Sequence, residues 1–240
     1  MNNIIKNIGI DVLNMYNNFY NTDINNLSNL HLLLNNDKVS IDTKNYYKTI
    51  PIFGVNDRNN EFINLFYHNY DIKNSALSKN YLELMHLIKK TYYPEEEYIV
   101  IQKTPNIRIH FPNCSNIGRL DTDKNEDIIG LHNDRMFGHS HSEMNLIVAF
   151  TDMYDTNSIF VEPEKGDISE KDYKAIEIKE NNLSFHYLNK LKHYNKINKT
   201  NKTRVSFDIR IIPFSQYEES KNKSATTNTK FTINNYYIKI

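Results

Sequence analysis

The sequence predicts a β core with helices on its N-terminal side. Three segments within the first 92 residues carry apolar side chains at three- and four-residue steps, which is the period of an amphipathic helix. From residue 98 onward the chain breaks into about eight short apolar segments separated by turn residues, a pattern typical of strands. Because helices do not alternate with these strands, a parallel α/β fold is disfavoured. The predicted fold class is therefore a mainly β sandwich or barrel supported by N-terminal helices.

The N-terminal region, residues 1–95, is predicted to be a helical support. Helices are expected over residues 3–20, 62–70 and 77–92, because each segment places its apolar residues on one stripe suited to packing on a sheet. Residues 21–60 are rich in Asn and Asp. Their short apolar islands, LHLLL and TIPIFGV, predict a loop with one or two edge strands.

Residues 96–240 are predicted to form the β core, in one integrated domain with the helices. Alternation is strict in residues 106–111, where Ile107, Ile109 and Phe111 share one face. The longest strand is expected over residues 203–214. Other strands are predicted over 98–102, 143–150, 158–162, 174–178, 183–187 and 231–240, with a charged loop at 116–127 and a polar, low-complexity segment at 215–228.

Charge and cysteine content narrow the class of protein. Lys plus Arg equal Asp plus Glu at 29 each, so no overall field recruits nucleic acid or an anionic membrane. A single cysteine, Cys114, excludes an intramolecular disulfide framework and is expected to be an apolar filler in a reducing compartment. The sequence has neither the pattern of a secretion signal nor a run of apolar residues long enough for a membrane span. We therefore expect a cytoplasmic protein.

The segment that follows the charged loop carries the strongest chemical signal. It places His132, Asp134, His139 and His141 within ten residues, directly before an apolar strand. In an extended segment, His132 and Asp134 point to the same face and can bind one ion. Two histidines and one carboxylate on one face of a divalent metal, with open positions opposite, are typical of non-haem Fe(II) oxygenases.

A third ligand and an anion site are available downstream. His186 and His193 are both candidates for the third ligand. On the predicted strand at 203–214, Arg204 and Ser206 share a polar face with Asp208 and Arg210. That face is either solvated or lines the interior of a barrel, where a buried Arg must meet an anion. Arg suits a carboxylate because its planar fork binds one bidentately.

Together these residues resemble the signature of Fe(II)/2-oxoglutarate-dependent dioxygenases. The residues that match the signature are His132-x-Asp134, His193, and Arg204-x-Ser206, which begins eleven positions after His193. The order of four longer blocks is similar to the streptomycin-biosynthesis-type branch of that family. The blocks are IQKTPNIRIHFP (101–112), HNDRMFGHSHSEMNLIVAFTD (132–152), NSIFVEPEKGD (157–167) and HYNKINKTNKTRVSFDIRIIP (193–213), and the resemblance covers about residues 98–214 plus the closing NNYYI.

The resemblance implies a double-stranded β-helix (jelly-roll) with iron at one open end. His132, Asp134 and His193 would bind Fe(II), and Arg204 and Ser206 would anchor 2-oxoglutarate. The retained acidic ligand favours hydroxylation or desaturation over halogenation. The implied partners are O2 and a polar small molecule, such as a sugar or nucleotide-sugar, with succinate and CO2 released. Helical additions pair subunits in some dioxygenases, so a homodimer is one of the oligomeric states that the resemblance allows.

Several residues have two interpretations. Arg108 and Gln102 lie in the first resembling block and would contact co-substrate or substrate, or else serve structural ion pairs and hydrogen bonds; Arg108 or Arg210 would be the anchor if Arg204 is not. Asn145 lies in an apolar strand and has to find hydrogen-bond partners, either in the site or in the core. His186 is expected in the core or a loop.

Two other classes of function compete with the oxygenase. His139, His141 and Glu143 would be the metal ligands of a cupin-type enzyme that does not use 2-oxoglutarate, although Glu143 follows His141 too closely for that motif. A non-catalytic β-sandwich binding module is the third class. The Arg204-x-Ser206 pair argues against the cupin-type enzyme, and the complete His132, Asp134 and His193 triad argues against the binding module.

Overall fold

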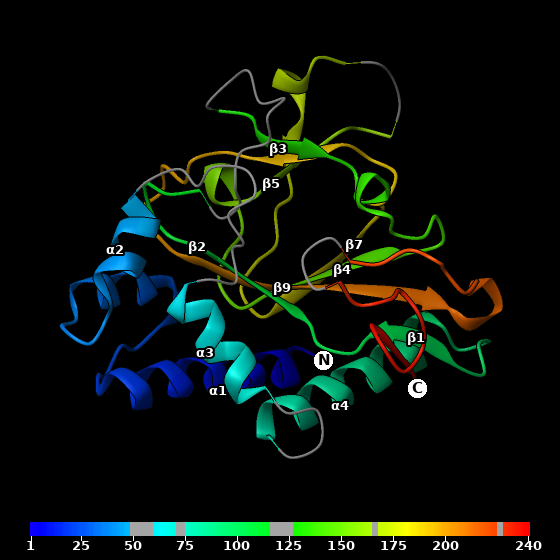
Figure 1. Cartoon of the computed structure of the whole chain (residues 1–240), viewed down its shortest axis with the longest axis horizontal. Coiled ribbons are helices and arrows are strands. Elements are labelled where there is room, and N and C mark those ends of the chain that lie inside the picture. The colour runs from blue at the N-terminus through cyan, green and yellow to red at the C-terminus, as the bar shows by residue number, and fades with distance from the viewer. Residues whose placement is uncertain (49–59, 71–74, 116–126, 165–167, 225–227) are drawn as a thin grey trace.

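A layer of helices, a large sheet and a small sheet are stacked in that order. The computed structural model describes residues 1–48, 60–70, 75–115, 127–164, 168–224 and 228–240. Figure 1 shows α1, α3 and α4 beneath the strands β2, β9 and β4, with β3 and β5 on the opposite side of those strands. This arrangement agrees with the predicted β core supported by N-terminal helices.

The three predicted helices are confirmed as α1 (Asn2–Tyr20), α3 (Glu61–Asn69) and α4 (Ala76–Tyr92). Side chains satisfy free backbone N–H groups at two of their starts. Asn60 accepts a hydrogen bond from the Ile63 N–H at α3, and Ser75 accepts one from Ser78 at α4. The predicted apolar stripes are buried against the large sheet; they include Ile5, Ile8, Val12, Tyr16, Phe62, Phe66, Tyr81, Leu84, Met85 and Ile88.

The prediction of edge strands within residues 21–60 was wrong for the described part of that segment. It forms a 3-10 helix, η1 (Leu27–Asn35), and a short helix, α2 (Ile41–Lys48). The Asn26 side chain caps η1 by accepting a hydrogen bond from Ser28. Leu27, Leu30 and Leu33 recur every three residues, which is the 3-10 period, and all three are buried. The TIPIFGV island, and most of the charged loop predicted at 116–127, lie outside the described residues.

Antiparallel strands form the large sheet, in the order β10-β1-β9-β4-β7, with β2 also paired to β9. The central strand β9 (Arg204–Pro213) is the longest one predicted. The other strands are β1 (Ile99–Gln102), β2 (Asn106–His110), β4 (Met144–Ala149), β7 (Asn182–His186) and β10 (Tyr237–Lys239). Only the last part of the strand predicted over 231–240 is therefore extended.

The small sheet has the order β3-β8-β5-β6 and is also antiparallel. Its strands are β3 (Ile129–His132), β8 (His193–Asn195), β5 (Ile159–Val161) and β6 (Lys174–Ala175). Strand β8 was not predicted, because three residues between lysines and asparagines are too few to show a period. The small sheet thus places His132 and His193 on neighbouring strands, as cross-strand partners.

The two faces of the large sheet differ in character. Leu146 and Val148 on β4 and Phe207 and Ile209 on β9 face the helices and belong to the main apolar core. The opposite face carries the polar residues of β9, together with Ile147, which packs with residues of the small sheet. The polar face of β9 is buried, so of the two interpretations the solvated one is wrong. In the part of the chain that the structure describes, no helix has the length and hydrophobicity that crossing a membrane requires.

Candidate metal centre

Three side chains converge where β3 ends and β8 begins. The Nε2 atoms of His132 and His193 each lie 3.7 Å from Oδ1 of Asp134, and the two imidazole centroids are 4.3 Å apart. One ligand atom from each residue can be chosen so that all three lie within 4.8 Å of one another. An extended segment was expected to include both His132 and Asp134. In the structure the strand ends at His132, and Asp134 begins the 3-10 helix η3 (Asp134–Phe137). These three residues are the group among the described residues that could hold a metal ion.

Both histidines are oriented by backbone carbonyls. His132 Nδ1–H donates to the Gly130 carbonyl, and His193 Nδ1–H donates to that of Leu191 at 3.1 Å. With the proton on Nδ1, each ring turns the lone pair of Nε2 toward Asp134. Burial, and then the neighbouring His132, lower the pKa of His193 to about 4. His193 is therefore neutral near pH 7, as a metal ligand must be.

The second oxygen of Asp134 is held by side chains of the large sheet. Oδ2 accepts hydrogen bonds from Asn145 Nδ2 at 2.9 Å and pairs with Arg210 Nη2 at 2.8 Å. Burial would raise the pKa of this carboxyl, but the charge of Arg210, together with the neighbouring His132 and His193, holds it well below its usual range. Asp134 is thus ionised, with Oδ2 occupied and Oδ1 turned toward the two histidines.

Asn145 has a fixed amide orientation. Its Nδ2 also lies 3.3 Å from Oδ1 of Asp208, so the amide faces two carboxylates. Flipping the amide would bring its oxygen against both of them, which excludes the alternative orientation. Asp208 in turn pairs with Arg210 and lies 3.8 Å from Arg108 Nη2. Carboxylates and guanidinium groups thus alternate in the order Asp134, Arg210, Asp208 and Arg108.

Arg204 is a buried cation without a hydrogen-bond partner among the described residues. Its exposure is 0%, and Nε, Nη1 and Nη2 all lack an acceptor. Burial, and then the nearby Arg108, lower its pKa to about 9, so it stays charged at pH 7. Ser206, two residues further along the same face of β9, is also buried. A buried guanidinium without an acceptor is costly and suits an anionic ligand.

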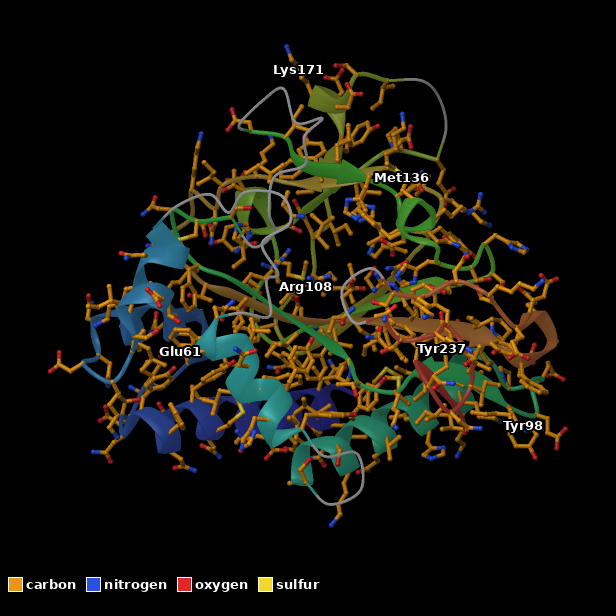
Figure 2. The ribbon with its side chains drawn as sticks, viewed as in Figure 1. Glu61, Tyr98, Arg108, Met136, Lys171 and Tyr237 are labelled. Carbon is orange, nitrogen blue, oxygen red and sulfur yellow. The ribbon has the colours of Figure 1, made fainter. Side chains whose placement is uncertain are left out.

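The other predicted site residues have different surroundings. Arg108 is part-exposed and lies on β2 directly opposite Ser206, on the side facing the small sheet (Figure 2). Gln102 is buried, and its amide bonds two backbone groups, donating to the Thr104 carbonyl at 2.7 Å and accepting from the Arg210 N–H at 3.3 Å. Asn145 donates hydrogen bonds to the carboxylates of Asp134 and Asp208.

The remaining histidines do not join the triad. His139 Nδ1 lies 2.8 Å from Oε2 of Glu143, which is fully buried. His141 is exposed, and no metal-binding group in the described chain contains it. His186 is the last residue of β7 and is half-buried, and its Nε2 has no hydrogen-bond partner in the described structure.

Cys114 is buried, and burial raises the pKa of its thiol to about 12, as expected of an apolar filler.

Sequence reasoning missed the partners of the triad. Arg210 was considered only as a substitute anchor for 2-oxoglutarate, and not as the partner of Asp134. Alternation along β9 signals that Arg210 shares a face with Arg204. Which carboxylate meets Arg210 depends on the pairing of β9 with β4 and on the course of η3, and no local pattern encodes these.

Comparisons with known proteins give one curated relative and several solved structures. No protein-family model matches the chain. The streptomycin biosynthesis protein StrG of Streptomyces griseus is 28% identical over 181 residues, covering 75% of this chain and 77% of that protein. A non-heme monooxygenase, ThoJ, aligns at 14% identity and TM-score 0.42, over 64% of each chain and so just under two thirds of its length. AviO1 from Streptomyces viridochromogenes aligns at 10% identity and TM-score 0.41, over 79% of this chain and 81% of that one.

Proposed function

We propose that the protein is an Fe(II)- and 2-oxoglutarate-dependent dioxygenase that oxidises a polar small molecule. His132, Asp134 and His193 would hold the metal, with two neutral imidazoles and one carboxylate on one side. This ligand set, which leaves positions open for other molecules, suits non-haem Fe(II). Bound Fe(II) with 2-oxoglutarate would supply the activation of O2, and succinate and CO2 would leave with the oxidised product.

The strand order supports a double-stranded β-helix as the core. Around β9 the large sheet runs β2-β9-β4-β7 and the small sheet runs β3-β8-β5-β6. Successive strands along the chain therefore tend to alternate between two antiparallel sheets, as in a jelly roll. We take residues 96–240 as this catalytic core and residues 1–95 as its helical support, within one domain.

The use of 2-oxoglutarate rests above all on the unpartnered guanidinium of Arg204. A buried cation with no acceptor lowers the stability of the fold unless an anion binds it. Arg204 lies on the same face of β9 as Arg210, which holds the metal-ligand candidate Asp134. A dicarboxylate that bound the metal through one carboxylate would need a cation for the other. Arg204 would supply that cation, and the hydroxyl of Ser206, on the same face of β9, would add a hydrogen bond.

The chain's own residues would have three tasks. The carbonyls of Gly130 and Leu191 hold the Nδ1 atoms of the two histidines, so that the Nε2 atoms would face the metal. Arg210 and Asn145 hold Oδ2 of Asp134, which leaves Oδ1 for the metal. The burial of Asp134 and His193 would limit the access of water to the metal ligands, and an oxygenase needs this to protect its substrate.

A polar metabolite is the substrate class we favour. The curated relative is named for streptomycin biosynthesis, which fits an enzyme of small-molecule chemistry. A sugar or nucleotide-sugar is our first choice within that class.

The test is anaerobic reconstitution of the protein with Fe(II) and 2-oxoglutarate, followed by a visible absorption spectrum. A weak metal-to-ligand charge-transfer band is expected, and it should be absent in the variant Asp134→Ala. The circular dichroism spectrum of that variant reports whether the fold is intact. Metal binding without the band would argue for a metalloenzyme that does not use 2-oxoglutarate, and an intact band in Asp134→Ala would refute the proposed ligand set.

A further inference from the structure

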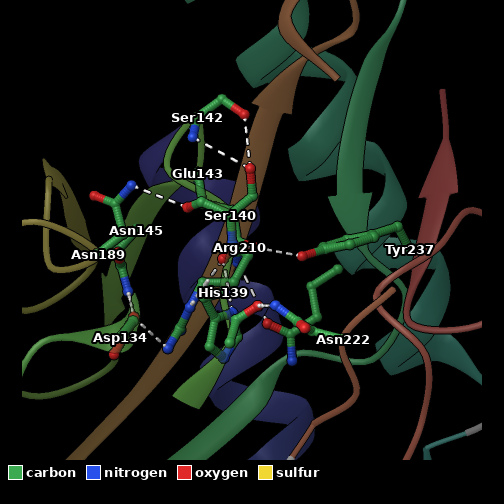
Figure 3. A network of polar contacts seen from close by, with 12 residues as sticks. Asp134, His139, Ser140, Ser142, Glu143, Asn145, Asn189, Arg210, Asn222 and Tyr237 are labelled. Carbon is green, nitrogen blue, oxygen red and sulfur yellow. Dashed lines mark hydrogen bonds and ion pairs between the residues drawn. The ribbon is translucent and has the colours of Figure 1, made fainter. Parts of the chain in front are cut away.

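A second buried polar cluster lies beside the proposed metal centre and connects it to the C-terminal strand. Its centre is Glu143, at the start of β4, whose side chain is fully buried. A buried carboxylate is stable only if hydrogen bonds and cations compensate for the lost water. Figure 3 shows Glu143 among His139, Arg210 and Tyr237, with Asp134 on the far side of Arg210.

Three donors fix Glu143. His139 Nδ1 lies 2.8 Å from Oε2, the Ser140 N–H donates to Oε1 at 3.0 Å, and the Tyr237 hydroxyl also donates to Oε1. Tyr237 belongs to β10 and is 1% exposed. Its hydroxyl therefore joins the C-terminal strand to the segment that follows Asp134 in the chain.

Arg210 is shared between Glu143 and the metal-ligand candidate. Its Nε lies 3.9 Å from Oε2 of Glu143, its Nη1 pairs with Asp208, and its Nη2 lies 2.8 Å from Oδ2 of Asp134. The planar guanidinium thus faces three carboxylates, with close pairs to Asp208 and Asp134 and a longer ion pair to Glu143, and its orientation depends on all three charges. Moving Glu143 would therefore turn the guanidinium and alter its contact with Asp134.

The C-terminal segment supports the same loop at two further points. Asn222 Nδ2 donates to the Gly138 carbonyl at 3.1 Å. Phe231 packs against the imidazole of His139 with ring centroids 4.4 Å apart. The loop between Asp134 and Glu143 is thus held from the C-terminal side by several residues. Among them, Tyr237 binds Glu143, the residue that faces Arg210.

We propose that Tyr237 is a positioning residue for the metal centre, acting through Glu143 and Arg210 on the carboxylate of Asp134. The hydroxyl of Tyr237 holds Glu143 in place, Glu143 and Asp208 set the plane of Arg210, and Arg210 keeps Oδ2 of Asp134 away from the metal. Removing the hydroxyl loosens Asp134 without removing any ligand. This inference rests on the proposed metal-binding function.

The variant Tyr237→Phe removes only the hydroxyl, and Tyr16→Phe is its matched control. Tyr16 is also buried and donates one hydrogen bond, to the Phe62 carbonyl at 2.9 Å, but it lies in the helical layer. Two quantities are measured in the full chain: the dissociation constant for Co(II), with its visible spectrum, and the unfolding midpoint of the metal-free protein. Outer partners of metal ligands, such as Arg210 here, typically change affinity 10- to 100-fold. Because Tyr237 lies two links further out, we expect Tyr237→Phe to weaken Co(II) binding by roughly three- to tenfold and to shift the Co(II) bands. Tyr16→Phe should lower the unfolding midpoint while leaving affinity and spectrum unchanged.

A double-variant cycle tests the route. Glu143→Gln removes the charge that faces Arg210, so in that background Tyr237→Phe should have little further effect on Co(II) affinity. Equal affinities and spectra for Tyr237→Phe and Tyr16→Phe would overturn the inference, as would independent, additive effects of Tyr237→Phe and Glu143→Gln. If the unsubstituted protein bound no Co(II), the proposed metal centre itself would fail, and this inference with it.

Discussion

Replacing Arg204 with Met tests the proposed anion site, because stability and ligand binding should move in opposite directions. The side chain is fully buried on β9 and has no hydrogen-bond acceptor among the described residues. Methionine keeps an unbranched chain in the same space and removes the charge. The metal-free protein should therefore become more stable, while its response to 2-oxoglutarate should disappear.

The size of the effect follows from the pKa of the guanidinium. Burial lowers it from 12.5 to about 9 in the fold. At 1.36 kcal/mol per pKa unit, the charged form is disfavoured in the fold by about 5 kcal/mol. Because pH 7 lies below both values, this cost is fully present there and is relieved only as the pH rises through 9. Replacing buried charges with apolar groups typically recovers about 1–4 kcal/mol, which is the gain expected for Arg204→Met.

Urea unfolding of the metal-free protein measures the first effect. A gain of 1 kcal/mol corresponds to roughly 2–4 °C in melting temperature for a chain of this length. The second effect is measured by thermal unfolding with Ni(II) and 2-oxoglutarate, where a ligand at a hundred times its dissociation constant stabilises by about 2.7 kcal/mol. The exposed Arg135, on η3, provides the control variant Arg135→Met, which should change neither quantity. The reasoning is refuted if Arg204→Met is less stable than the natural chain and still responds to 2-oxoglutarate.

Two further predictions concern stability alone. Burial, and then Arg204, lower the pKa of His110 to about 3, so the unfolded chain takes up the proton first as the pH falls below 6.5. Stability should drop by up to about 1.4 kcal/mol per pH unit between pH 6 and 4, and His110→Gln should flatten this slope in urea unfolding; an unchanged slope would exclude His110 as its source. Gly138 has a φ of +85°, and a Cβ there would lie 3.1 Å from Cβ of Asn222. Gly138→Ala should therefore cost about 1–3 kcal/mol in chemical unfolding, whereas Gly9→Ala, whose Cβ would meet Phe150 at an ordinary 3.5 Å, should cost nothing; equal effects would argue against strain at Gly138.

Local periodicity predicted most elements of this fold. The stripes of α1, α3 and α4 and the alternation of β2 and β9 are set by residues three, four or two apart, so the sequence displays them directly. Segments without a period were predicted poorly. The LHLLL island forms part of the 3-10 helix η1. Strand β8, which carries His193, is too short to show alternation.

The sequence by itself determined which residue types were available and which of them share a strand face: His132 and Asp134 two apart, and Arg204, Ser206, Asp208 and Arg210 alternating along β9. Only the tertiary structure decided how they meet. Pairing of β3 with β8 brings His193 to His132, and pairing of β9 with β4 brings Arg210 to Asn145. Packing of β10 against β1 brings Tyr237 to Glu143, and burial leaves Arg204 without a partner among the described residues. The physical reason is that period fixes the face on which a side chain lies, whereas strand register and sheet packing fix its neighbours across tens of residues of chain.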